Sequence, residues 1–173
     1  MKPILQRLSA AGASPWIPVS SRGDVFGISF GCSVSSGGTL TYSVQHTFDN
    51  PELTETVSIA RTTTTATITF TTPHGLSVGD SVVITGIRES NLSGTFAVAS
   101  VPSTTTATYT VSDTGSAAES AQCSKLRVFE HDTVTGIVDA SIDAGYELPP
   151  RCVRVNVSAY TDGVLDTNWM FLD

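Results

Sequence analysis

Few residues of this sequence have the types and spacing that catalysis would need. Residues 27–31 read Gly-Ile-Ser-Phe-Gly, which matches the Gly-x-Ser-x-Gly pattern around the nucleophile of many hydrolases. In those enzymes the serine lies on a sharp turn between a strand and a helix, which exposes its hydroxyl group. Here the alternation of apolar and polar residues continues to Val34, so Ser29 falls on the polar face of an uninterrupted strand. We therefore expect no catalytic serine.

The three histidines also favour structural roles. His46 falls on the apolar face of an alternating run, where a neighbouring hydroxyl or carbonyl group can satisfy a neutral ring. His74 precedes a turn glycine, and His131 sits beside Asp132 in an expected loop. The spacing of these histidines is not that of metal ligands.

The carboxylates are scattered in the same way. Asp139 and Asp143 flank one possible strand, and Asp49 and Glu52 share one loop. Carboxylates in such positions are usually solvated, and no calcium-loop pattern surrounds them. We predict no catalytic, cofactor-binding or metal-binding residues, no bound cofactor and no enzyme activity.

The cysteines are odd in number: Cys32, Cys123 and Cys152. We interpret them as small buried hydrophobic residues of a protein made in a reducing cytosol, rather than as a disulfide framework. Residues 22–24 read Arg-Gly-Asp, the integrin-binding tripeptide. Because a match of three residues arises easily by chance, we interpret this tripeptide as a turn.

The composition narrows the classes of partner. Charged residues make up only 14% of the 173 residues and the net charge is −7. No cluster of lysine and arginine is present, which argues against a nucleic-acid partner. No apolar run approaches the roughly 18 residues that a membrane-spanning helix requires. A surface built mainly from Thr, Ser, Asn and Gly suits a chain that is mostly strand and that is covered in an assembly.

The clearest structural signal is the stretch Asp24–Phe48, which contains two alternating runs joined by Ser-Ser-Gly-Gly. One face of these runs is apolar, with Phe26, Ile28, Phe30, Cys32 and Val34 in the first run and Leu40, Tyr42, Val44, His46 and Phe48 in the second. Side chains alternate between the two faces of a strand, and glycine lets the chain reverse. We predict a long antiparallel hairpin whose apolar face packs on a second sheet.

The composition changes after Asp49-Asn50-Pro51 and becomes rich in Thr, Ser and Ala. Thr62–Phe70 and Ser103–Val111 are nearly the same β-branched string, which suits paired strands. Further strands are expected at Ser81–Thr85 and Gly94–Val101, and residues 115–124 are expected to be a connector of small residues. The sequence favours a five-stranded antiparallel module here.

Apolar alternation returns after this segment, most clearly in Arg151–Tyr160 and Val164–Leu172. Residues 1–54 and 127–173 together are about the size of one antiparallel sandwich. We predict an all-β fold in which a smaller, barrel-like module, residues 55–126, is inserted into one loop of that sandwich. Residues 1–14 are expected to be a mobile arm, and Trp16 is expected to anchor the core.

Two segments resemble a known group of proteins. SPWIPVSSRGDVFGISFGCSVSSGGTLTYSVQHTFDNP (residues 14–51) and LPPRCVRVNVSAYTDG (residues 148–163) resemble small β-sandwich virion proteins of short-tailed bacteriophages. Residues 71–112 contain a sequence similar to a small β module that recurs in phage tail and fibre proteins. Most members of the first group lack this insert, and the family is not enzymatic.

The resemblance implies a non-enzymatic structural protein of a tailed-phage virion, made in the bacterial cytoplasm. The place it favours is a short fibre or appendage at the head–tail junction or tail. A capsid decoration protein and a module that binds host carbohydrate through the insert are the alternatives. The expected partners are further copies of the chain, with a trimer favoured, and neighbouring adaptor, portal, nozzle or major capsid proteins.

Overall fold

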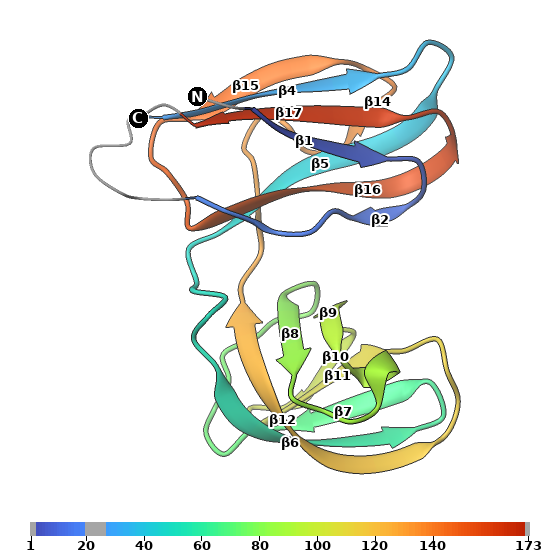
Figure 1. The fold of residues 1–173 in the computed structure, drawn as a ribbon, viewed down its shortest axis with the longest axis vertical. Coiled ribbons are helices and arrows are strands. Elements are labelled where there is room, and N and C mark those ends of the chain that lie inside the picture. The colour runs from blue at the N-terminus through green and yellow to red at the C-terminus, as the bar shows by residue number, and fades with distance from the viewer. Residues whose placement is uncertain (1–2, 20–26, 172–173) are drawn as a thin grey trace. The chain divides into compact units, whose positions relative to one another are not determined.

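A computed structural model describes residues 3–19 and 27–171 of the chain. Strands make up 58% of the structure, and its described residues contain no α-helix, only a single 3₁₀ turn at Ser90–Leu92. The chain forms two compact units (Figure 1). The sandwich unit comprises Met1–Phe48 and Phe129–Asp173, and the inserted unit comprises Asp49–Val128. The fold is therefore all-β, as the sequence predicts.

Two antiparallel sheets form the sandwich unit. The first sheet has the order β1 (Ile4–Leu8), β17 (Leu165–Phe171), β4 (Ile28–Val34) and β15 (Ile142–Tyr146). The second is built on β5 (Thr39–Thr47) and β16 (Cys152–Asp162), which β13 (Phe129–Glu130), β14 (Ile137–Val138), β2 (Gly12–Ala13) and β3 (Ile17–Pro18) extend. Figure 1 shows these sheets as two layers within the unit.

The predicted hairpin at residues 24–48 is wrong. Strand β4 pairs with β15 and β17, whereas β5 pairs with β13, β14 and β16, so the chain crosses from one sheet to the other between β4 and β5. Alternation identifies the buried face of a strand but not its partner. The buried faces of both strands contribute to one core, which explains why the pattern looked continuous. Phe26 and the Arg-Gly-Asp tripeptide lie outside the described residues.

The Ser-Ser-Gly-Gly tract makes this crossing by packing against the turn between β16 and β17. The backbone N–H of Ser35 donates to the carbonyl of Val164, and the N–H of Val164 donates to the Ser35 hydroxyl, both at 2.9 Å. Gly163 has a φ of +103°, and a Cβ atom placed there would lie 2.5 Å from the Cα atom of Gly38. Glycine is needed at this contact because a side chain would collide with the neighbouring backbone.

The core between the two sheets is apolar and centres on Trp169 and Tyr42, both fully buried. Phe30 packs against Trp169 with ring centroids 5.0 Å apart. Ala159 continues the alternation of Val153, Val155 and Val157, but it is exposed. A register shift after Val157 turns the strand at that point.

Trp16 does not anchor this core as expected. It lies half-buried over Arg154, whose guanidinium is 4.2 Å from the indole ring. Arg154 alternates with the core valines of β16 and therefore belongs to the outer face of the second sheet. Its Nε donates to Gln45 Oε1 at 2.8 Å, and burial lowers its pKa to about 10. The second sheet is thus covered on both faces at this point.

Residues 3–14, expected to belong to a mobile arm, are instead part of the fold. Strand β1 pairs with β17 along its whole length, and β2 pairs with β16. Gln6 explains much of this order, because its Oε1 accepts hydrogen bonds from Trp169 Nε1 at 3.1 Å and from Ser14 Oγ at 3.0 Å. Arg7 forms an exposed ion pair with Asp166 at 2.7 Å. The sequence does not predict this edge strand, because its apolar run is short and is interrupted by Gln6 and Arg7.

One curled sheet forms the inserted unit, with seven strands rather than the expected five. Its order is β10 (Ser100–Ser103), β11 (Thr106–Thr110), β7 (Thr65–Thr69), β6 (Glu55–Thr62), β12 (Ser116–Leu126), β8 (Ser81–Thr85) and β9 (Gly94–Ala97). The curl brings Phe96 of β9 against Tyr109 of β11, with ring centroids 4.3 Å apart. The two similar Thr-rich strings do pair, because β7 and β11 are neighbours.

The predicted small-residue connector at residues 115–124 is wrong as well. It is almost all of β12, which is paired on both sides, with β6 and with β8. Small side chains hide the alternation that brings Ala121 and Cys123 into the core. The same unit buries Arg61, whose Nη2 contacts Glu89 Oε1 at 2.6 Å. Gly115 leaves room for this guanidinium, because a Cβ atom there would overlap Arg61 Nη2.

The contact between Gln6 and Trp169 gives a direct test of the edge strand. Replacing Gln6 with Ala leaves the buried indole N–H of Trp169 without its acceptor, which should lower the free energy of unfolding by about 1–3 kcal/mol. Leu5, on the same strand, is 72% exposed, so Leu5→Ala should change stability by about 0.5 kcal/mol or less. Urea unfolding of both variants measures the difference, and equal effects would contradict the assigned role of Gln6.

Candidate functional site

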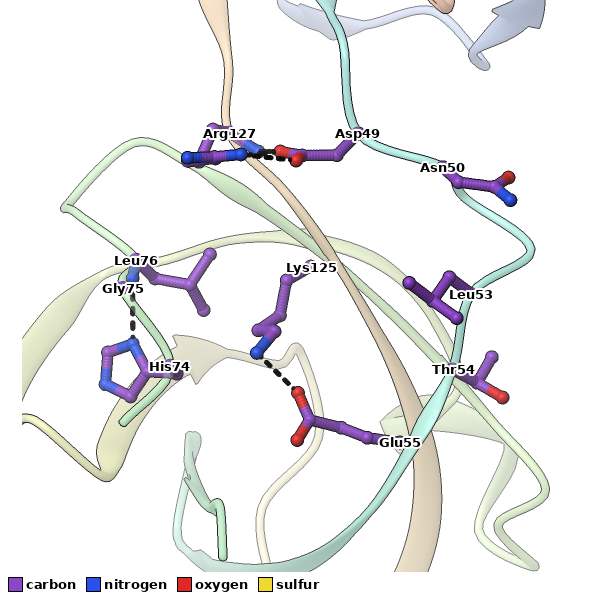
Figure 2. A pocket seen from close by; sticks show the side chains of 10 residues that line it. All are labelled: Asp49, Asn50, Leu53, Thr54, Glu55, His74, Gly75, Leu76, Lys125 and Arg127. Carbon is purple, nitrogen blue, oxygen red and sulfur yellow. Dashed lines mark hydrogen bonds and ion pairs between the residues drawn. The ribbon is translucent and has the colours of Figure 1, made fainter. Parts of the chain in front are cut away.

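The inserted unit has a cavity of about 530 Å³ at one end of β12, shown in Figure 2. Residues from three segments line it: Asp49, Asn50, Leu53, Thr54, Glu55, His74, Gly75, Leu76, Lys125 and Arg127. Strand β12 supplies Lys125, and Glu55 begins the neighbouring strand β6. The remaining residues come from the loops on either side.

The charged groups of this cavity are paired with one another. Arg127 donates to the Asp49 carboxylate through Nε at 3.1 Å, Nη2 at 2.7 Å and its backbone N–H at 2.7 Å. Lys125 Nζ contacts Glu55 Oε1 at 2.6 Å and lies 5.5 Å from the ring centroid of Phe70. Figure 2 shows Arg127 facing Asp49 and Lys125 facing Glu55. A charged ligand would have to compete with these internal partners.

His74 closes the loop below this cavity. Its Nδ1 accepts the backbone N–H of Leu76 at 2.9 Å, and its Nε2 lies 3.1 Å from the carbonyl oxygen of Ser103. A neutral ring with the proton on Nε2 satisfies both contacts. Both ring nitrogens of His74 are therefore engaged in contacts with the backbone of its own unit.

The sandwich unit has a second cavity, here called the sandwich cavity, of about 560 Å³. Its lining residues come from β5, the loop after β13, β15 and the loop that follows β15: His46, His131, Asp132, Thr133, Ala144, Gly145, Tyr146, Glu147 and Leu148. His131 is held by Gly145, whose carbonyl lies 3.0 Å from Nε2, and by Thr133, whose N–H donates to Nδ1 at 3.3 Å. This histidine is therefore fixed as well.

His46 lies between the sandwich cavity and a group of exposed rings. Its Nδ1 is 3.3 Å from the hydroxyl of Tyr146. The Phe129 ring stacks on the imidazole at 5.7 Å and an interplanar angle of 26°, and Phe48 meets its edge at 5.3 Å. Burial lowers the pKa of His46, and the neighbouring His131 lowers it further. The ring is therefore neutral near neutral pH, as expected for a half-buried structural histidine.

The exposed rings beside His46 form what we call the aromatic shelf, made of His46, Phe48 and Phe129. Phe48 is 59% exposed and Phe129 is 47% exposed. Phe48 was expected on the buried face of its strand, but it lies one residue beyond the end of β5 and is not covered by the core. The two rings lie side by side, with centroids 6.1 Å apart, and both are exposed to solvent.

The other residues singled out by the sequence do not come together as a catalytic site. Ser29 is exposed within β4, which continues to Val34 without the turn that a nucleophile requires. Asp143 is exposed on β15, while Asp139 accepts the backbone N–H of Leu40 at 2.6 Å. Glu52 is exposed, and its N–H donates to Asn50 in a turn.

Within residues 3–19 and 27–171, no three His, Cys, Asp or Glu side chains converge in a way that could hold a metal ion. That same part of the chain has no helix of the length and apolar character that crossing a membrane requires. No protein-family model matches the chain. No curated protein matches it either.

Sequence reasoning identified His46 and Phe48 but neither Phe129 nor the shelf that the three residues form. His46 and Phe48 were visible in one run, whereas Phe129 is about 80 positions away and reaches His46 only because β13 pairs with β5. The available signal was a large aromatic residue at each end of the Thr- and Ser-rich segment, where polar linker residues are usual.

All three cysteines lie in the described part of the chain, are buried, and form no disulfide. Burial raises the pKa of Cys32 to about 11 and that of Cys123 to about 12. Because the thiolate is the reactive form, a thiol reagent such as 5,5′-dithiobis(2-nitrobenzoate) should label neither residue in the folded protein near pH 8. Both should react fully in urea. Rapid labelling of the native protein, followed by absorbance and peptide mapping, would contradict this assignment.

Protonation of Asp49 should weaken the inserted unit in acid. The hydrogen bond from Arg127 is the main cause that holds the pKa of the Asp49 carboxyl below its ordinary value, and burial acts in the opposite direction. Its stabilising contribution is therefore complete above the ordinary pKa of about 3.9 and is lost as the pH falls through the lower folded-state value. Asp49→Asn should lower the thermal midpoint near neutral pH and reduce its further fall in acid.

The matched control for Asp49→Asn is Glu52→Gln, which changes an exposed carboxylate in the same loop. This variant should follow the wild-type dependence of thermal midpoint on pH. If Asp49→Asn also follows the wild-type curve, the ion pair with Arg127 contributes nothing measurable, as is common for exposed pairs.

Proposed function

We propose that this chain is a non-enzymatic structural protein of a tailed-phage virion, forming a short fibre or appendage at the head–tail junction or tail. The observation that carries the proposal is the position of the two segments that resemble virion proteins. They contain β5 and β16, which pair from Thr47 with Cys152 to Thr39 with Asp162. The two segments that resemble virion proteins are therefore neighbours in the second sheet, although they are far apart in the sequence.

The surface of the sandwich unit supports a role in an assembly. Large apolar side chains are exposed on several of its elements, among them Ile4, Leu5, Val138 and Met170. The edge strand β1 presents Leu5 at 72% exposure, with Arg7 as the charged residue beside it. Exposed edges with few charges favour pairing with other chains. Further copies of the chain and neighbouring virion proteins would cover these surfaces, and a trimer is the copy number we favour.

A capsid decoration protein is the nearest alternative, since it would use the same kind of surface. The idea that the inserted unit binds host carbohydrate receives less support. Its aromatic residues serve its own core: Phe70 and Tyr109 are buried, and Phe96 is packed against the same cluster. The partners we propose are accordingly proteins of the particle, such as the adaptor, portal, nozzle or major capsid protein.

Purified particles of the phage that encodes this chain provide the test. After density-gradient purification, quantitative mass spectrometry should find the chain in a fixed ratio to the major capsid protein. Immunogold labelling should place it at the tail or head–tail junction, whereas labelling over the whole shell would favour the decoration role. Absence of the chain from the purified particles would refute the proposal.

A pair of variants tests which surface is used. Leu5→Glu places a charge on the exposed edge strand and should reduce incorporation into particles while leaving the isolated protein folded. Val78→Glu makes the same change at a residue of the inserted unit that is 67% exposed, and it should be incorporated normally. Equal incorporation of both variants would exclude β1 as a contact surface.

A further inference from the structure

We propose that the aromatic shelf and the sandwich cavity together bind a neutral carbohydrate. The shelf offers the apolar part of such a site. Phe129 stacks on His46 and lies 6.1 Å from Phe48 between ring centroids, and both phenylalanines are exposed, at 47% and 59%. The face of an aromatic ring is electron-rich and attracts C–H groups, which line one side of a pyranose ring.

The sandwich cavity offers the polar part. Asp132 and Glu147 are exposed carboxylates on its lining, and Thr133 adds a hydroxyl group. Carboxylates accept hydrogen bonds from sugar hydroxyls, and charge-assisted bonds of this kind are stronger than neutral ones. A few polar groups beside an aromatic surface are the usual composition of a small-ligand site.

The floor of the site is held in place before any ligand arrives. His131 is fixed by hydrogen bonds to Gly145 and Thr133, and His46 is enclosed by the rings of Phe48, Phe129 and Tyr146. His131 and Tyr146 also contact each other, with ring centroids 4.7 Å apart. Rings that are already ordered lose little conformational entropy on binding, which favours affinity.

The charge of the site selects the class of sugar. The residues that line the sandwich cavity include two acids and neither lysine nor arginine. The whole chain carries a net charge of −7. Uronic acids, sialic acids and phosphorylated sugars would therefore be repelled, while neutral hexoses, deoxyhexoses and N-acetylhexosamines would not. This inference concerns the sandwich unit and does not depend on the proposed place in a virion.

Saturation-transfer difference NMR on the full chain tests the proposal. The probes are short neutral oligosaccharides of glucose, galactose, mannose, rhamnose and N-acetylglucosamine, with oligogalacturonate as the anionic comparison. At least one neutral probe should receive saturation at its C–H protons, and oligogalacturonate should not. Phe129→Ala should weaken binding of that probe by about tenfold, the amount expected for one lost aromatic contact. Glu147→Gln should weaken binding without affecting the shelf.

Val138→Ala is the matched control, because Val138 is 61% exposed on β14 but lies outside both the shelf and the cavity. Its affinity should equal that of the wild type. If Phe129→Ala loses its cooperative thermal transition, Phe48→Ala and Glu147→Gln provide the same comparison. Failure of all neutral probes, binding of oligogalacturonate alone, or equal loss in Val138→Ala would overturn the proposal. Self-association that Phe129→Ala abolishes would identify the shelf as a contact between copies, and would overturn it too.

Discussion

The pairing of β5 with β16 is the contact on which the sandwich unit depends. The inner face of this pair supplies Tyr42, Val44 and Val155 to the core, and the outer face buries Gln45 and Arg154. Around Arg154 both faces of this pair are covered, so side chains on both faces leave water there and stabilise the unit. The shorter strands β2, β3, β13 and β14 attach to this pair and give the second sheet its width.

The same pair explains how the chain accommodates an insertion of about 80 residues. The chain leaves β5 after Thr47 and returns at Phe129, which pairs directly with His46. Within the inserted unit, the first residue of β6, Glu55, pairs with Cys123 near the end of β12. Both units thus have their connection points on adjacent antiparallel strands, about 5 Å apart. An insertion joined in this way interrupts a loop without disturbing the hydrogen bonds of either sheet.

The sequence predicted the faces of strands better than their partners. Alternation located β4, β5 and most of β16, because an apolar face must be buried whichever strand lies beside it. It could not show that β4 and β5 belong to different sheets, since their buried faces meet in one core. The long strand β12 was missed because its small side chains carry little hydrophobic contrast.

The local settings of single residues were easier to predict than the aromatic shelf. Ser29, His46 and His74 could each be assigned to strands or turns from their immediate neighbours. The aromatic shelf depends instead on one pairing between residues far apart in the chain, His46 with Phe129. Edge strand β1 was hidden for a related reason. This strand is held in place by the hydrogen bonds that Gln6 accepts from Trp169 and Ser14. The local pattern of apolar residues does not predict such long-range hydrogen bonds.

The adjacent connection points of the inserted unit have a consequence for how such a chain can be modified. A loop whose two ends are one strand spacing apart can accommodate a domain whose own ends are equally close. Asp49 and Arg127 lie near the two ends of the inserted unit and form an ion pair. Both residues belong to the inserted unit, so this contact would be removed together with it. The sandwich unit should therefore tolerate another domain in place of the inserted unit, provided that the ends of that domain lie equally close together.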